Sequence, residues 1–213
     1  MTTVEVLFAR FQEKMKPSAW ERWLATLPRT LHSSILRYRR WQDQQLHLFG
    51  KLLLKKGAQA AGAAGALESL QTDINERPFC DGPIDFNISH AGEVAVCAVG
   101  CGVRLGIDVE KVAEIDFGAY ESYMTADEWR RIEASARPLR EFFTYWTIKE
   151  SVMKADGRGM DIPLETILVR EGFARLDLRR WRLHAVPLCP GYVCHLATDR
   201  AGVEVSVGEV VFD

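Results

Sequence analysis

The sequence predicts an α+β protein built from two similar halves that meet near residue 104. Two observations support this fold class. Segments with helical periodicity precede a group of short strands, and the same order occurs a second time further along the chain. With 213 residues, of which 47% are hydrophobic, the chain can bury a sizeable core. These observations fit one globular unit, and they fit equally two small subdomains that share an interface.

The first half, residues 1–104, is expected to begin with helices. Apolar positions recur at three and four residues through WERWLATL and again through ILRYRRWQDQQLHLFGKLLLKK. The small-residue segment 57–67 either extends the second helix or connects it to the next element, since alanine favours helix and each of its three glycines costs about 1 kcal/mol there. From Ile84 the pattern changes to two strands, IDFNISH and VAVCAVG, with a turn at Ala91-Gly92.

The second half, residues 105–213, is expected to repeat this plan. It opens on the strand VRLGIDVE, whose alternation places Val103, Leu105, Ile107 and Val109 on a core-facing side. A polar helix around TADEWRRIEAS and a more apolar helix around FFTYWTIKESVMK come next. Strands are predicted in WRLHAVPL, GYVCHLAT and VEVSVGEVVF.

Composition narrows the classes of partner. A formal net charge of -2 gives no general reason to expect nucleic acid or a membrane surface. The N-terminus MTTVEVLFARFQEK has no signal-peptide pattern, and no window approaches transmembrane length, so we expect a cytoplasmic protein. The five cysteines include no CxxC pair and are expected to be reduced thiols, without a disulfide framework or a zinc site.

The helix FFTYWTIKESVMK carries charges where its surface should be most apolar. Lys149 and Glu150 fall inside the apolar arc, and Lys154 lies at its edge, one turn beyond Glu150. Burying such groups is costly unless they are paired or hold a ligand. A pair between Glu150 and Lys154 within the helix, worth about 0.2 to 0.5 kcal/mol, and a ligand site are both open at this point. For Lys149 we expect a salt bridge to the other half.

Two further motifs carry polar groups that could do chemistry. Asp108 and Glu110 lie two apart on one strand face, where paired carboxylates suit Mg²⁺, although solvated strand faces also carry such pairs. Ser89 and His90, in FNISHAG, end a strand beside a glycine, where an imidazole and backbone amides can meet an anion. A Ser-His nucleophile is disfavoured because neighbouring strand residues point to opposite faces and no GxSxG elbow surrounds them. A turn serine beside a hydrogen-bonded histidine is the alternative.

Together, and in this order, ERPF, FNISHAG, GIDVE and WTIKESVMKADGRGM resemble the motifs of the 4′-phosphopantetheinyl transferase superfamily. They run from Glu76 to Met160, roughly 40% of the chain, and the ordered set is far more specific than any one motif. The length is similar to that of the pseudo-dimeric, broad-specificity group, the surfactin-synthetase-activating group. This resemblance implies a monomer whose two halves are related by a pseudo-two-fold axis, with the active site in the cleft between them.

The resemblance also implies roles for single residues. Asp108, Glu110 and Glu150 match the acids that hold Mg²⁺, for which Mn²⁺ is a possible substitute, and Glu150 is also the candidate general base. Lys154 matches the catalytic lysine that contacts the coenzyme A pyrophosphate, to which Asp108 is also assigned.

Other residues are implied to contact the rest of coenzyme A, mainly from the N-terminal half. His90, with Ser89 beside it, matches the histidine that contacts a phosphate. Arg77 stands where the family usually has a lysine near the adenine nucleotide.

Two departures from the family pattern concern coenzyme A. Ala91 replaces the last serine of the family's SHS motif and removes a hydroxyl. The stretch QDQQLHLFGK, where members often place Lys or Arg for the 3′-phosphate, carries little fixed positive charge. RYRR or Lys51 could compensate, and the sequence does not assign that role.

The activity implied is transfer of phosphopantetheine from coenzyme A to a serine of an acyl or peptidyl carrier protein, with release of adenosine 3′,5′-bisphosphate. The carrier could belong to fatty-acid, polyketide or nonribosomal-peptide synthesis, and the sequence does not say whether acylated coenzyme A is accepted. Two alternatives stay open. One is a non-catalytic coenzyme A binding protein of the same fold, and the other is a Mg²⁺-dependent nucleotide phosphohydrolase, which needs no carrier protein.

Overall fold

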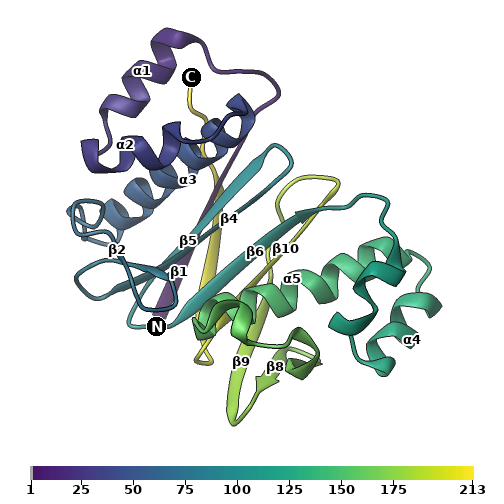
Figure 1. Ribbon diagram of the computed structural model, residues 1–213. Helices are drawn as coiled ribbons and strands as arrows, with labels where there is room; N and C mark the ends of the chain where they lie inside the picture. Colours follow the sequence, from purple (N-terminus) through teal and green to yellow (C-terminus); the bar gives the residue numbers. More distant parts are fainter. Residues whose placement is uncertain (1) are drawn as a thin grey trace.

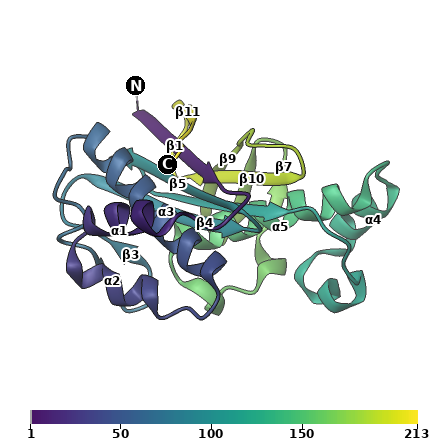
Figure 2. The ribbon, with the colours of Figure 1, turned by 90° about the horizontal axis from the view of Figure 1, so that it is seen from above.

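A computed structural model describes residues 2–213 and contains two main sheets, each covered by one long helix (Figure 1). The helices are α1 (Pro17–Ala25), α2 (Arg29–Leu36), α3 (Trp41–Ala60), α4 (Ala126–Ala134) and α5 (Pro138–Asp156). Three 3₁₀ segments follow the second sheet's first strand: η1 (Phe117–Tyr123), η2 (Gly159–Asp161) and η3 (Leu164–Thr166). Figure 2 shows α1, α2 and α3 at one end of the molecule and α4 at the other.

The first sheet has the strand order β11-β1-β5-β4. Its strands are β1 (Thr2–Arg10), β4 (Ile84–Ala91), β5 (Val94–Cys101) and β11 (Val203–Glu209). β1 pairs antiparallel with β5 and parallel with β11, so the sheet takes its outermost strand from the end of the chain. The division of the chain at residue 104 remains a prediction. The residues of β11 fall in the predicted second half, but this strand belongs to the first sheet.

The second sheet has the order β6-β10-β9-β8-β7. Its strands are β6 (Leu105–Lys111), β7 (Leu168–Arg170), β8 (Phe173–Leu176), β9 (Arg179–Ala185) and β10 (Tyr192–Thr198). A small separate hairpin is formed by β2 (Gln71–Thr72) and β3 (Pro78–Phe79). The predicted α+β class is confirmed, because each half packs one long helix, α3 or α5, on one sheet.

The expectation that the first half begins with helices is wrong for residues 2–10, which form β1. Val4, Val6 and Phe8 of this strand pack into the core between the two sheets. Leu7 and Ala9, on the opposite side of the strand, pack into the core under α3. A strand buried on both faces reads as a continuous apolar run, in which period alone does not distinguish strand from helix.

The core between the two sheets confirms the predicted alternation along β6. Val103, Leu105, Ile107 and Val109 are buried against residues of β1, β5 and β10. The opposite side of β6 faces α5, and Gly106 lies directly against the helix backbone. A Cβ atom on Gly106 would lie 2.3 Å from the backbone nitrogen of Ala155 and from the carbonyl oxygen of Ser151. The glycine of GIDVE therefore lets the backbone of α5 rest directly on β6.

α5 has clear start and stop signals. Pro138 occupies its first turn, where a missing N–H costs nothing. Gly157 ends it in the left-handed conformation, with φ of 94°, and donates its N–H to the carbonyl of Met153. The helix therefore stops just after Lys154.

We expect Gly106→Ala to destabilise the fold by more than about 2 kcal/mol, because the new methyl group meets helix backbone that cannot rotate away. Urea unfolding measures this change. Gly65→Ala is the matched control, since a Cβ atom at Gly65 meets nothing within 4 Å. An unchanged stability of Gly106→Ala would contradict the described contact between α5 and β6.

A second expectation concerns acid stability. His195 on β10 is buried and its Nδ1 lies 2.8 Å from the Thr147 hydroxyl of α5. Burial, and then Arg140, lower the pKa of His195 from 6.5 to about 4. The unfolded chain thus binds a proton that the folded chain rejects, so stability present above about pH 6.5 is lost as the pH falls toward 4. Between pH 7 and pH 5 the loss from this group is about 2 kcal/mol.

Urea unfolding of the wild type and His195→Gln at the two pH values measures this contribution. The wild type should lose about 2 kcal/mol more than the variant on going from pH 7 to pH 5. Equal losses in the two proteins would contradict a neutral, buried His195.

Candidate active site

The site lies where the edge strands of the two sheets meet. β4 and β6 run beside each other (Figure 1), yet they belong to different sheets. Side chains of β4 take the place of a partner strand by accepting hydrogen bonds from alternate backbone amides of β6. These bonds run from Leu105 N to Asp85 Oδ2 (2.9 Å), from Ile107 N to Asn87 Oδ1 (2.9 Å) and from Val109 N to Ser89 Oγ (3.4 Å).

Asp108 is the most buried acid of the site. Ser89 donates its hydroxyl hydrogen to Asp108 Oδ1 at 2.8 Å, and Lys154 Nζ lies 2.5 Å from the same oxygen. Lys154 also donates to Ser89 Oγ at 3.2 Å. The second oxygen, Asp108 Oδ2, is buried and has no hydrogen-bond partner among the described residues. A buried carboxylate oxygen without a donor is costly, which makes it a candidate ligand atom.

The ion pair of Lys154 therefore reaches β6 and is not the intrahelical pair considered from the sequence. Burial alone would lower the pKa of Lys154, but Asp108, Glu150 and Glu110 outweigh it and raise that pKa above its ordinary value. Lys154 is thus a fixed positive charge among three acids.

A cleft of about 320 Å³ opens above these groups. Both sheets and α5 contribute to its wall. The lining residues are Ile88, Ser89, His90, Asp108, Glu110, Trp146, Glu150 and Lys154. The structure thus brings together six residues that the sequence singled out, and it adds Ile88 and Trp146.

Two acids in the cleft have pKa values above those of ordinary carboxyl groups. Burial and then the neighbouring charge of Asp108 raise the pKa of Glu110 to about 7. Burial likewise raises the pKa of Glu150, with Lys154 opposing the shift. Carboxylates crowded in this way are stabilised by an added cation.

Among residues 2–213 no three His, Cys, Asp or Glu side chains are grouped closely enough to hold a metal ion as they stand. The donor chemistry nevertheless fits a hard divalent cation. Three carboxylates line one cleft, and one of their buried oxygens lacks a donor. Mg²⁺ usually keeps several waters and takes only one or two carboxylates.

Beside the acids, an aromatic stack leads from His90 of β4 to α3. His47 of α3 stacks on Tyr38 at a centroid distance of 4.0 Å and meets the His90 ring edge-to-face at 4.9 Å. Burial, followed by His90, Lys51 and Arg37, lowers the pKa of His47 to about 4. Burial and then Lys154 lower the pKa of His90.

The sequence prediction did not assign Tyr38 or His47 to the site. The available signal was the position of His47 in α3 next to a basic stretch, and it could not reveal the stack.

Arg77, in the loop between β2 and β3, points inward. It is buried and donates to the carboxylate of Asp85 and to the carbonyls of Leu105 and Lys154. Arg77, together with Asn87, Lys154 and Gly157, lines a smaller hollow of about 230 Å³ beside the main cleft.

The prediction that Lys149 pairs with the other half is wrong. Lys149 is fully buried and pairs at 2.9 Å with Glu128 of α4, in its own half. Its ammonium also donates to the carbonyls of Leu164 and Ile167, each at 3.0 Å. Glu128 also accepts from the backbone N–H of Thr125 in a capping box, so the TADE motif was the available signal.

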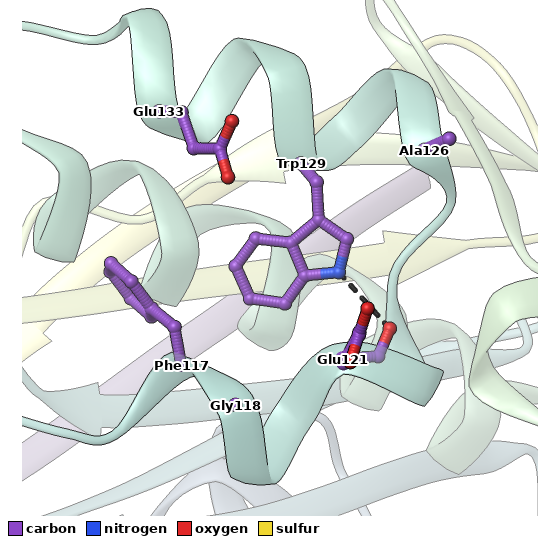
Figure 3. A pocket seen from close by; sticks show the side chains of 6 residues that line it. All are labelled: Phe117, Gly118, Glu121, Ala126, Trp129 and Glu133. Carbon is purple, nitrogen blue, oxygen red and sulfur yellow. Dashed lines mark hydrogen bonds between the residues drawn. The ribbon is translucent and has the colours of Figure 1, made fainter.

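A separate hollow of about 380 Å³ lies between η1 and α4 (Figure 3). Its lining residues are Phe117, Gly118, Glu121, Ala126, Trp129 and Glu133. The Trp129 indole N–H, on the side of α4, donates to the carbonyl of Glu121 in η1. It contains none of the residues that the sequence singled out.

Known proteins identify the family. Residues 104–197 match the model of the 4′-phosphopantetheinyl transferase superfamily, and residues 14–101 match the model of the 4′-phosphopantetheinyl transferase N-terminal region. The chain is 30% identical over 169 residues to the 4′-phosphopantetheinyl transferase gsp of Aneurinibacillus migulanus, covering 78% of this chain and 71% of that protein. The chain belongs to the 4′-phosphopantetheinyl transferase superfamily.

Other members of the superfamily are similar over shorter or equal stretches. A 4′-phosphopantetheinyl transferase of Bacillus subtilis is 28% identical over 166 residues, with 74% of each chain covered. The transferase Sfp of Bacillus subtilis (strain 168) is 32% identical over 87 residues, which are 40% of this chain and 38% of that protein. A holo-[acyl-carrier-protein] synthase structure from Thermotoga maritima aligns with 16% identity and a TM-score of 0.35, over 44% of this chain and 61% of that one.

The two family models and the similar transferases gsp and Sfp confirm the predicted family, its broad-specificity group and the class of activity, a phosphopantetheinyl transferase. The roles predicted for single residues stay predictions. No helix of residues 2–213 combines the length and the apolar character needed to cross a membrane. All five cysteines are free.

Lys149→Met should destabilise the protein by about 3 to 5 kcal/mol, because Glu128 is left as an unpaired buried charge. Adding Glu128→Gln to this variant should recover part of the loss, since the amide oxygen can still accept from Thr125. Thermal and urea unfolding of both variants measure the effect. A loss below about 1 kcal/mol for Lys149→Met would contradict a structural role for the pair.

Proposed function

We propose that this transferase moves the 4′-phosphopantetheine group from coenzyme A to a serine hydroxyl of a carrier protein in the cleft between β4, β6 and α5. The single observation that carries the proposal is the convergence of Asp108, Glu110, Glu150 and Lys154 on that cleft, with Asp108 Oδ2 buried and without a donor. A basic group among acids suits a reaction in which charge develops on pyrophosphate oxygens.

We assign Asp108, Glu110 and Glu150 as the residues that would hold Mg²⁺. When bound, such an ion would neutralise the charge that develops on the pyrophosphate. Mn²⁺ accepts the same oxygen donors, so it is a possible substitute. Asp108 is already oriented for this role by Ser89, Lys154 and the bonds that hold β6.

Lys154 and Glu150 would act directly on the reacting groups. The serine oxygen forms a bond to the β-phosphorus of coenzyme A, and the bond from that phosphorus to the oxygen of adenosine 3′,5′-bisphosphate breaks. Glu150, half-buried on the cleft wall, would accept the serine proton, and this type of catalysis contributes on the order of 10² to 10⁴ in rate. Lys154 would stabilise the negative charge that appears on the leaving group.

The remainder of coenzyme A would extend toward the first half. His90, at the end of β4 beside the cleft, is the proposed phosphate contact. The aromatic stack of His90, His47 and Tyr38 leads from it to the exposed guanidinium of Arg37, which supplies fixed positive charge that residues 41–50 of α3 lack. Ser89 would contact the phosphates while it keeps its hydrogen bonds to Asp108 and Lys154. Arg77 lines the neighbouring hollow proposed for the adenine nucleotide.

The partner would be an acyl or peptidyl carrier protein. This transferase would act on it as a monomer. Fatty-acid, polyketide and nonribosomal-peptide carriers are all candidates. A cytoplasmic location belongs to the same proposal and is supported by the five free cysteines, since reducing compartments keep thiols unpaired.

The experiment is intact mass spectrometry of a panel of apo carrier proteins after incubation with coenzyme A, Mg²⁺ and the protein. We expect a gain of one phosphopantetheine on at least one carrier. Glu150→Gln and Asp108→Asn should each lower the rate by about 100-fold or more. Glu141→Gln, in the first turn of the same helix and outside the cleft, is the matched control and should react like the wild type.

Wild-type rates in Glu150→Gln would contradict the assignment of the acids. Binding of coenzyme A without transfer to any carrier would favour the non-catalytic binding protein. Cleavage of coenzyme A in the absence of a carrier would favour the phosphohydrolase.

A further inference from the structure

Arg77 is held in a tight hairpin that fixes where its side chain points. Asp73 Oδ1 accepts the backbone N–H groups of Asn75 and Arg77, each at 2.9 Å. Glu76, between them, has φ of 62°, and the Asp73 N–H donates to the Arg77 carbonyl at 3.0 Å. With the backbone fixed on both sides, the guanidinium is directed toward the junction of β4, β6 and α5.

One part of the guanidinium joins β4 to β6. Its Nη2 group donates to both carboxylate oxygens of Asp85, at 2.9 and 2.8 Å, and to the carbonyl of Leu105 at 3.0 Å. Asp85 Oδ2 in turn accepts the N–H of Leu105. Both backbone polar groups of Leu105, the first residue of β6, are therefore fixed by this pair.

The other part of the guanidinium joins the C-terminus of α5. Arg77 Nε donates to the carbonyl of Lys154 at 3.1 Å. Arg104 donates to the next two carbonyls, those of Ala155 at 2.7 Å and Asp156 at 3.2 Å. The last carbonyls of a helix lack partners within it and carry its negative dipole end, so two arginines cap this end.

These hydrogen bonds leave little of the Arg77 side chain free to contact a ligand. Its side chain is 5% exposed. Turning it toward a nucleotide would leave the Asp85 carboxylate and two carbonyls without their donor, and buried polar groups without a partner destabilise the fold. The same bonds fix the backbone of Lys154, and they fix β6 three residues before Asp108.

We propose that Arg77 is a positioning residue, which holds Lys154 and Asp108 in register with each other and does not itself contact coenzyme A through its side chain. The proposal rests on the function proposed above for this cleft. At Gly106 the backbone of α5 packs directly against β6, and the bond from Arg77 to Asp85 joins both elements to β4. A displacement of about 1 Å at reacting groups lowers rates by up to about 100-fold.

The test compares the wild type with Arg77→Gln and Arg77→Lys. Transfer kinetics give kcat, calorimetry gives the Kd of coenzyme A, and hydrogen exchange reports on residues 150–157. Arg77→Gln should lower kcat by roughly 10- to 100-fold, leave the Kd within about twofold and speed exchange at the end of α5. Arg77→Lys should be intermediate in kcat, since an ammonium can pair with Asp85 but cannot reach all three acceptor groups.

Arg158→Gln is the matched control. Arg158 pairs with Asp156 near the same helix end, but its side chain is half-exposed and its partners lie within the second half. We expect wild-type kcat and wild-type exchange at residues 150–157 in this control.

Two outcomes would overturn the proposal. A Kd raised tenfold or more with unchanged kcat would make Arg77 a direct contact to coenzyme A, and unchanged kcat and exchange would deny it any role. If Arg77→Gln does not fold, Arg77→Lys carries the same comparison. If the wild type transfers nothing, the proposed function fails, and the exchange of residues 150–157 still decides whether Arg77 holds the helix end.

Discussion

The structure depends on the hydrogen bonds that side chains of β4 make to the backbone of β6. Asp85, Asn87 and Ser89 meet alternate amides of a strand that belongs to another sheet. Backbone pairing would place these strands about 4.8 Å apart and leave no room between them. Side chains of β4 bond the backbone of β6 instead, and a polar cleft opens at the end of the junction.

Three charged residues in the apolar arc of α5 have three different environments. Lys149 is a buried structural cation that binds α4 and the segment around η3. Glu150 faces the cleft, and Lys154 spans from the helix to Asp108 on β6. A single helix therefore carries core packing, a structural ion pair and the reactive groups, because Gly106 allows it to lie directly on the strand that bears the acids.

The sequence predicted the fold class, and residues that it singled out lie together at one cleft because Asp108, Glu150 and Lys154 belong to motifs with fixed local spacing. It failed where the determinants are non-local. The apolar residues of β1 fit both the helix period and the strand period, and only pairing with β5 and β11 makes this segment a strand. The partner of Lys149 and the stack of His47 on Tyr38 depend on how distant segments pack, which spacing along one chain does not encode.

The most direct measurement of the central claim is a crystal structure of the protein with coenzyme A and Mg²⁺. We predict an ion bound at Asp108 Oδ2, the pyrophosphate in the cleft beside Lys154, and the bonds from Asp85, Asn87 and Ser89 to β6 preserved. A pyrophosphate bound outside this cleft, or an ion that leaves Asp108 Oδ2 without a partner, would contradict the proposed site.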